Sequence, residues 1–282
     1  MIKKLLKGIV IGIANIIPGV SGGTMAVSMG IYDKLIYALT HLFKDFKNSM
    51  KILLPILGGA GIGIVGLSFI IEIMYEKVPF QTNLLFIGLI IGGLPAICKK
   101  VKGQSIRISH VLAFLAFFAV VIGLSMLGEK DGIDANLSIS VGNSLKMFGI
   151  GVIASATMVI PGVSGSMVLM LMGYYTPILE TINNFIRSLI AFDMNGIGNG
   201  LGILVPFGIG VIIGIFAIAK IIEFIFERFS QVAYWAIIGL IVSSPIAILL
   251  VNKSMPTSII TGITGIIALA IGYIIAKRLG DE

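Results

Sequence analysis

The sequence predicts an all-α polytopic membrane protein, built as an inverted repeat of two similar halves. Hydrophobic residues make up 57% of its 282 positions and charged residues only 12%, whereas a soluble domain carries about 25% charged residues. Several apolar runs approach the roughly 20 residues with which a helix spans a bilayer. Two of these runs are interrupted by the same short motif. Together these observations predict membrane-embedded helices and an internal duplication.

The interrupting motif is Pro-Gly-Val-Ser-Gly, which occurs at 18–22 and again at 161–165. Each copy breaks a helix, because proline lacks a backbone donor and glycine loosens the backbone. Inside a membrane, the freed N–H and C=O groups must line a protein-enclosed or wet cavity. Broken segments at matching places in two halves are typical of the binding site of a transporter.

The second half repeats the first beyond the motif. The register that aligns the two motifs also aligns Gly30-Ile31-Tyr32 with Gly173-Tyr174-Tyr175. A slightly larger offset then aligns Pro55 with Pro206, Gly59 with Gly210, Gly63 with Gly214, Glu72 with Glu223, and Gly88 with Gly239. We therefore predict two homologous halves, at residues 1–135 and 136–282.

Each half is expected to contain a Pro/Gly-broken re-entrant helical hairpin, an interfacial amphipathic helix and three transmembrane helices, in that order. In the first half these elements are expected at 5–29, 34–48, and near 52–74, 83–98 and 108–127. In the second half the corresponding ranges are 145–172, 177–192, 201–223, 232–251 and 258–277. Apolar residues at helical spacing predict one apolar face on each surface helix, which suits the membrane interface.

The distribution of Lys and Arg favours broken segments that enter the membrane and return. If all eight apolar segments crossed, ten of the twenty basic residues would lie on each side, against their bias toward cytoplasmic loops. With two re-entrant hairpins, fifteen lie inside and five outside. Three crossings per half then turn the second half upside down relative to the first. Both termini are expected in the cytoplasm, and the apolar N-terminus is expected to be retained.

Polar groups at the two turns predict an anion site. A helix that starts after each turn exposes unpaired N–H groups and a partial positive charge, which bind phosphate. The candidate substrate-binding residues are Asn15, Pro18, Gly19, Ser21, Gly22, Gly23, Thr24, Pro161, Gly162, Ser164, Gly165 and Ser166. Two tips that meet at mid-membrane would form one nearly twofold site. Alternatively, the small residues serve close packing and each serine caps its own helix.

Two acidic residues and three aromatic residues are further candidates. Glu72 and Glu223 occupy matched positions in apolar sequence, where acids are candidates for ion coupling. Alternatively, they form ion pairs at the interface with basic residues one turn away. Tyr32, Tyr175 and Trp235 are expected to anchor the protein at the membrane interface.

Other classes of function find little support in the sequence. The Gly-x-Ser-Gly form is shared with rhomboid-type intramembrane proteases, whose serine needs a neighbouring base. His41 falls on a predicted surface helix and His110 at a helix end, so we expect no enzyme. We expect no cofactor and no metal, since no such motif or ligand cluster is present. The single Cys98 excludes an internal disulfide. The basic charge of a membrane chain orients it in the bilayer and does not indicate nucleic acid.

Around both turns the sequence resembles the polyprenyl-phosphate (undecaprenyl-phosphate) transporters of the PopT type, formerly a membrane family of unknown function. The resemblance rests on Asn15–Thr24, on Ile160–Gly165 and on the Gly-x-Tyr that follows in each half. It covers essentially the whole chain. The second copy departs from the pattern, since Met158 and Ser166 replace the asparagine and the second glycine of the first copy. The two tips are therefore expected to bind unequally.

The resemblance implies a carrier in the cytoplasmic (inner) membrane that returns undecaprenyl phosphate from the outer to the inner leaflet. This recycles the carrier lipid of cell-wall synthesis. The lipid and the bilayer are the implied partners, and alternating access is the expected mechanism. The alternatives are a secondary carrier for a small soluble anion at the same site and, more remotely, a rhomboid-like intramembrane serine protease.

Overall fold

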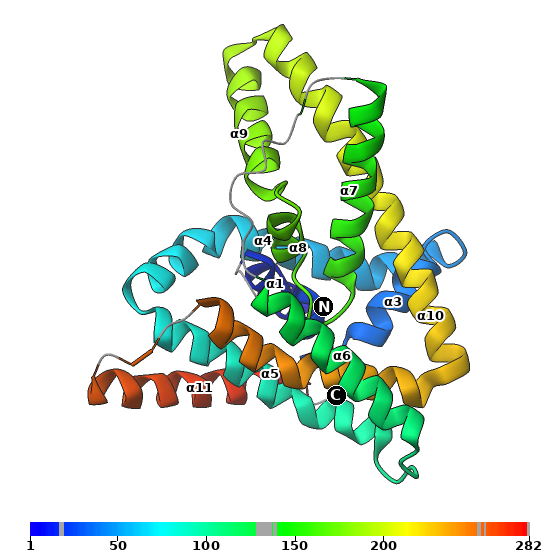
Figure 1. Ribbon diagram of the computed structural model, residues 1–282, viewed down its shortest axis with the longest axis vertical. Helices are drawn as coiled ribbons and strands as arrows, with labels where there is room; N and C mark the ends of the chain where they lie inside the picture. Colours follow the sequence, from blue (N-terminus) through cyan, green and yellow to red (C-terminus); the bar gives the residue numbers. More distant parts are fainter. Residues whose placement is uncertain (17–19, 128–136, 138–139, 253–254, 257, 281–282) are drawn as a thin grey trace.

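All regular secondary structure in the computed structural model is α-helical within the residues that it describes, 1–16, 20–127, 137, 140–252, 255–256 and 258–280 (Figure 1). The helices are α1 (Ile2–Ile16), α2 (Gly22–Ser28), α3 (Tyr32–Thr40), α4 (Phe46–Lys77), α5 (Pro79–Val101), α6 (Ile108–Met126), α7 (Val141–Val159), α8 (Gly165–Leu171), α9 (Tyr175–Ala191), α10 (Met194–Asn252) and α11 (Ile259–Gly280).

At the places predicted for hairpins, α1 packs against α2 and α7 packs against α8. The short helices α2 and α8 end in the same way. Gly30 and Gly173 follow them with positive φ angles of 66° and 74°. In each case, the N–H groups of the glycine and of the next residue bond back to the last turn at 2.8 to 3.0 Å. This helix ending favours glycine, and it turns the chain into α3 or α9.

The surface helix expected at 34–48 is shorter in the structure, because α3 ends at Thr40 and α4 begins at Phe46. The chain turns at His41, whose carbonyl oxygen accepts two later backbone N–H groups. Phe43 and Phe46 are 87% and 64% exposed. The predicted boundary was wrong because the spacing of apolar residues does not reveal this turn. The turn ends the helix before Phe43 and places Phe46 on α4.

The helices expected near 201–223 and 232–251 form one element, α10, which is bent at Phe229 (φ −133°, ψ 40°). We call residues 194–228 its first segment and 230–252 its second segment. The two predicted helices correspond to these two segments, which meet at a kink with non-helical backbone although no proline or glycine lies near it.

The first half breaks at the matching position. Val78 has φ −138° and ψ 55°, and the offset that aligns Gly59 with Gly210 aligns Val78 with Phe229. Here Pro79 follows and starts the separate helix α5. Proline favours this position because its missing N–H would have no partner in the first turn of a helix. Both halves thus leave helical geometry at one matched position, and only the first continues with proline.

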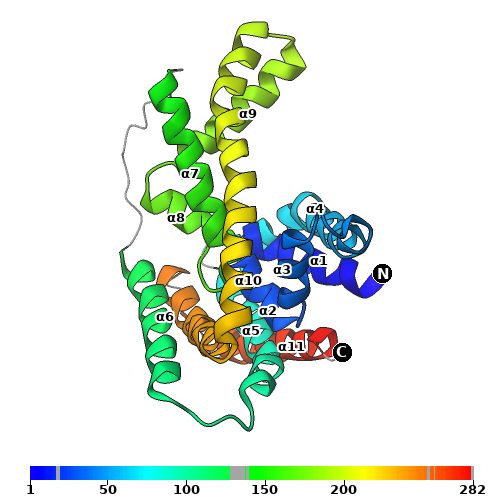
Figure 2. The same cartoon turned by 90° about the vertical axis from the view of Figure 1, so that its right-hand side faces the viewer.

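Four helical segments form a layer in the lower part of Figure 1: α5, α6, α11 and the second segment of α10. In this layer α5 packs against α11, and α6 packs against α10. Each pair therefore joins a helix of one half to a helix of the other. By contrast, α7, α9 and the first segment of α10 project from the layer as an arm (Figures 1 and 2).

Matched glycines mediate matched helix contacts in the two halves. Gly59 of α4 lies against the carbonyl group of Leu5 in α1, and Gly210 of α10 lies against that of Phe148 in α7. In the layer, Gly88 contacts the carbonyl group of Leu269, and Gly239 contacts that of Phe114. At all four glycines a side chain would collide with backbone. Close backbone approach at small residues is a common packing mode in membranes.

The outer surface of these helices suits lipid. Among the described residues, the helices long and apolar enough to cross a membrane are α5, α6, α10 and α11. Large apolar side chains such as Ile259 and Ile266 are 84% and 67% exposed, as expected where hydrocarbon rather than water surrounds a helix. The chain is therefore a helical membrane protein, as its composition indicates.

We expect Gly59→Ala to destabilise the protein and the neighbouring Gly58→Ala to stabilise it slightly. A Cβ atom at Gly59 would overlap the carbonyl group of Leu5, whereas nothing lies within 4 Å of one at Gly58. Overpacking costs about 1–3 kcal/mol, and Gly→Ala in an open helix gains up to about 1 kcal/mol. Thermal unfolding in detergent measures both changes. Melting temperatures that move in the same direction would contradict this packing.

Candidate functional site

The second broken turn lies in direct contact with α2, the helix that follows the first turn. The backbone N–H of Gly162 donates a 2.6 Å hydrogen bond to Oγ1 of Thr24. Next to it, a Cβ atom at Gly23 would lie 3.1 Å from the carbonyl oxygen of Val159. The hydroxyl group of Tyr32 donates to that same carbonyl oxygen at 3.1 Å. The turn of the second hairpin therefore sits on α2 and on the start of α3.

Glycine is required at two places in this junction. Gly162 has a φ of 84°, and a Cβ atom there would also lie 2.9 Å from the Cβ atom of Leu240 in α10. Gly23 leaves just enough room for the opposing turn, so that its backbone and that of Val159 approach closely. The motif glycines thus allow backbone to meet backbone, which side chains would prevent.

The serines of the motif do not cap their own helices. Ser21 and Ser164 both precede a helix with extended backbone, at φ −104° and −90°, and neither side chain makes a capping hydrogen bond. The capping alternative is therefore wrong. Ser164 Oγ lies 2.7 Å from Ser166 Oγ, whereas Ser21 Oγ is buried with no hydrogen-bond partner among the described residues.

An unpartnered buried hydroxyl is unusual and costs about 1–3 kcal/mol. Ser21 is only 5% exposed, and Thr24 beside it is fully buried. The described residues thus bring Ser21, Thr24 and Gly162 to one junction that is closed in this structure. Ser21 leaves hydrogen-bonding capacity there that the protein itself does not use.

The side chain that lies over the first glycine of the helix differs between the two tips. A Cβ atom at Gly22 would lie 2.6 Å from Oδ1 of Asn15, while one at Gly165 would lie 2.5 Å from Cγ of Met158. Asn15 and Met158 occupy matched positions, so the same place carries an amide in the first tip and a thioether in the second. The remaining candidate residues Pro18 and Gly19 lie outside the described residues. Pro161 is buried in the second turn.

Tyr32 does not anchor the protein at the interface, as its aromatic character suggested. It is 5% exposed, and burial, followed by the neighbouring Asp33 carboxylate, raises the pKa of its phenol. The hydroxyl group therefore stays protonated and can donate to the second hairpin. The prediction was wrong because the left-handed turn at Gly30 directs the start of α3 into the junction. Gly30 was the feature of the sequence that could have predicted the buried position of Tyr32.

Glu223 pairs with the other half of the chain. Its Oε1 atom accepts a 2.7 Å hydrogen bond from Thr40 and lies 3.2 Å from Nδ1 of His41. The basic residues one turn away, which were the expected ion-pair partners, are not its partners in the described contacts. The side chain of Glu72, the matched acid, lies outside the described residues.

The two histidines have partners away from the motif serines. His41 interacts with Glu223, and Nδ1 of His110 accepts a hydrogen bond from the backbone N–H of Arg107 at 3.2 Å. The ring of His110 stacks on that of Trp235 at a centroid distance of 6.3 Å. The described hydrogen bonds of both histidines therefore reach neither Ser21 nor Ser164.

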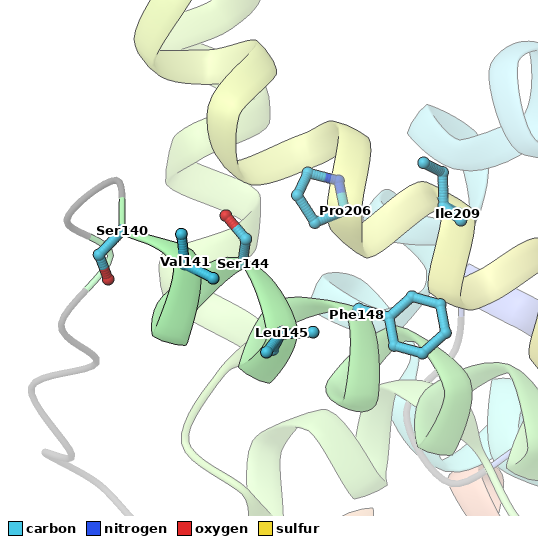
Figure 3. Close-up of a pocket in the computed structure, with 7 residues that line it drawn as sticks. All are labelled: Ser140, Val141, Ser144, Leu145, Phe148, Pro206 and Ile209. Atoms are coloured by element: carbon cyan, nitrogen blue, oxygen red, sulfur yellow. The ribbon is translucent and has the colours of Figure 1, made fainter.

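A groove of about 590 Å³ lies elsewhere, between the beginning of α7 and α10 (Figure 3). It is lined by apolar side chains such as Leu145, Phe148 and Pro206, with the hydroxyl groups of Ser140 and Ser144 at one end. The groove and the Gly162 turn thus lie at opposite ends of α7. Its lining suits an apolar chain and not a phosphate group.

We expect Thr24→Val to weaken the junction. The substitution keeps the shape of the side chain but leaves the buried N–H of Gly162 without its acceptor, which costs about 1–3 kcal/mol. Thermal unfolding in detergent measures the loss. Thr24→Ser keeps the hydroxyl group and is the matched control, so equal stability of the two variants would contradict the role of the hydrogen bond.

Comparison with known proteins agrees with this architecture. A family model described as VCA0040-like, undecaprenyl phosphate translocase-like, matches residues 11–266. A protein of Staphylococcus aureus (strain NCTC 8325 / PS 47) named polyprenyl-phosphate transporter is 30% identical over 280 residues, which cover 98% of this chain and 95% of its own. A protein of the same name from Vibrio cholerae serotype O1 (strain ATCC 39315 / El Tor Inaba N16961) is 25% identical over 257 residues, covering 86% and 76%.

No solved structure matches the chain. The family match spans both hairpin turns and almost all of the helices, and the resemblance found in the two motifs is thereby confirmed. The chain belongs to the undecaprenyl phosphate translocase-like family of membrane proteins.

Proposed function

We propose that this protein carries undecaprenyl phosphate, or a similar polyprenyl phosphate, from the outer to the inner leaflet of the cytoplasmic membrane for reuse in cell-wall synthesis. The names of the two relatives support the substrate class. The observation that carries the proposal is the hydrogen bond from Gly162 to Thr24, which joins the second broken turn to α2, the helix that follows the first. It brings the polar groups of both halves to one place.

The phosphate group would bind where these turns meet. Ser21 supplies a hydroxyl group without a protein partner, and the N–H groups that open α2 have no acceptor within the helix. Ser164 and Ser166 supply two more hydroxyl groups. Hydrogen bonds to a charged phosphate are roughly twice as strong as neutral ones. Because α2 and α8 have only seven residues each, these local donors matter more than a helix dipole.

The substrate would compete with the contact between the turns. In the closed junction, Thr24 satisfies the N–H of Gly162. A phosphate oxygen can replace that acceptor once the turns move apart, and it can engage Ser21 at the same time. Binding and separation of the turns are then coupled, as alternating access requires. Glycine at 23 and serine at 166 make the two tips unequal, so each binds the phosphate differently.

The repeat supports movement between two opposed states. Matched glycines make matched contacts in both halves, as in carriers built from inverted repeats that expose one central site to each side in turn. The start of α1 and the end of α11 lie on the same side in Figure 2, in keeping with two cytoplasmic termini. The polyprenyl chain would stay in lipid beside the exposed apolar helices, so that only the phosphate enters the protein.

The test is translocation of undecaprenyl phosphate in proteoliposomes, followed with a membrane-impermeant reagent that reacts with its phosphate in one leaflet. We expect Ser21→Ala to slow translocation about tenfold or more, because one hydrogen bond to a charged group is worth about 1.5–3 kcal/mol and each 1.4 kcal/mol is about a factor of ten. Ser49→Ala is the matched control, since Ser49 is also buried and unpartnered but lies at the start of α4.

Three outcomes separate the parts of this proposal. Equal rates for Ser21→Ala and the wild type would contradict the site. No translocation by the wild-type protein would contradict the function. Uptake of radiolabelled inorganic phosphate into the same proteoliposomes, without lipid translocation, would instead identify a carrier for a small anion.

A further inference from the structure

The bend at Phe229 connects two parts of the molecule. Before it, the first segment of α10 belongs to the arm with α7 and α9, and after it the second segment lies in the four-helix layer (Figure 1). Any change in the angle between the arm and the layer therefore passes through this bend. The second hairpin turn, carried by α7 and α8, lies against the layer side of this bend, where a Cβ atom at Gly162 would contact Leu240.

The short helix α3 holds α10 on both sides of the bend. On the arm side, Thr40 donates to Glu223 at 2.7 Å, and His41 lies 3.2 Å from the same carboxylate. On the layer side, the hydroxyl group of Tyr234 donates to Asp33 at 3.2 Å. The two ends of α3 thus form hydrogen bonds with the two segments of α10, on either side of Phe229.

A lysine from the layer adds a contact at the layer-side end of α3. Nζ of Lys100, in α5, lies 3.1 Å from Oδ2 of Asp33 and 5.6 Å from the centre of the Tyr234 ring. Asp33 therefore joins α3 to both α5 and α10. The layer end of α3 has two partners, Lys100 and Tyr234, whereas the arm end depends on the single carboxylate of Glu223.

The polar contacts at both ends of α3 are suited to release. The side chains of His41 and Glu223 are 31% and 26% exposed, those of Lys100 and Asp33 are 50% and 45% exposed, and partly exposed polar pairs are weak. A pocket of about 310 Å³ between α3 and α10 adjoins these contacts, with Asp33, Tyr37, Glu223, Glu227, Ser230 and Tyr234 among its lining residues. Ile36 and Phe226 also line it and are packed in the core, so movement of the bend against α3 shifts part of this apolar packing.

The repeat contains a second hinge without the same contact. Val78 matches Phe229, and α9 matches α3. In the register that aligns the two motifs, Asn183 and Asn184 take the places of Thr40 and His41, and both are exposed on α9. Each half therefore carries a surface helix and a hinge, while the described contact across a hinge is made by α3.

We propose that α3 is a brace that fixes the Phe229 hinge in one conformation of the transport cycle and releases it in the other. In the opposite conformation, Asn183 and Asn184 of α9 brace the hinge at Val78. Thr40, Glu223, Asp33 and Tyr234 then act as positioning residues, because they set the angle of the arm and do not touch the substrate. This inference rests on the proposed function for its place in a transport cycle, but the brace itself is testable without transport.

The test measures the angle directly in the full chain. Spin labels at Ile190→Cys in α9 and Met126→Cys in α6, in a Cys98→Ser background, report the distance between arm and layer by pulsed electron resonance. We expect Thr40→Val/Tyr234→Phe, which removes one hydroxyl group on each side of the hinge, to shift or broaden the distance distribution. The control Thr181→Val/Tyr273→Phe makes the same chemical changes away from the contacts between α3 and α10, in α9 and α11, and the hydroxyl of Thr181 bonds within α9. Identical distributions for both variants would overturn the brace.

A reversible cross-link tests its role in the cycle. Thr40→Cys/Glu223→Cys, in the same background, is joined by a short reagent with a reducible disulfide. We expect translocation of undecaprenyl phosphate to fall at least tenfold when cross-linked and to recover on reduction. Unchanged translocation by the cross-linked protein would overturn release of the brace. Absence of translocation by the Cys98→Ser protein, which keeps Thr40 and Glu223, would count against the proposed function, while the spin-label distances would still decide the brace.

Discussion

The structure depends on one constraint: backbone freed by a helix break inside an apolar protein must find a partner. The second turn meets this constraint through the helix that follows the first turn, because Thr24 of α2 accepts a hydrogen bond from the N–H of Gly162. The position matched to Thr24 in the second half is Met167, which has no hydroxyl group. The repeat therefore cannot make this contact twice, and the hydrogen bond that joins the halves is asymmetric.

The same asymmetry extends to the hinges. Both halves leave helical geometry at the matched residues Val78 and Phe229, but only the first follows with proline. Each hinge thus separates two helical segments, and a proline starts the second segment only in the first half. The surface helices differ in the same way, since α3 reaches across to α10 through Thr40 and Asp33. Because of such small differences at matched positions, the described contacts across a hinge are made by the surface helix of the first half.

Close packing at matched glycines is the symmetric part of the structure, to which these asymmetric contacts are added. Gly59 and Gly210 bring α1 to α4 and α7 to α10, while Gly88 and Gly239 pair helices of opposite halves. In lipid, where apolar side chains gain little by leaving their surroundings, close backbone contact is a main source of helix association. The layer can therefore stay intact while the turns and the arm change their positions.

The sequence by itself determined the membrane class and the family, and it predicted the duplication and the two turns, because composition, apolar run length and Pro/Gly breaks act locally. Only the tertiary structure decided which groups meet: Gly162 with Thr24, and Glu223 with Thr40 and His41. These partners are more than a hundred residues apart, so their contact depends on how whole helices pack, which no local pattern encodes.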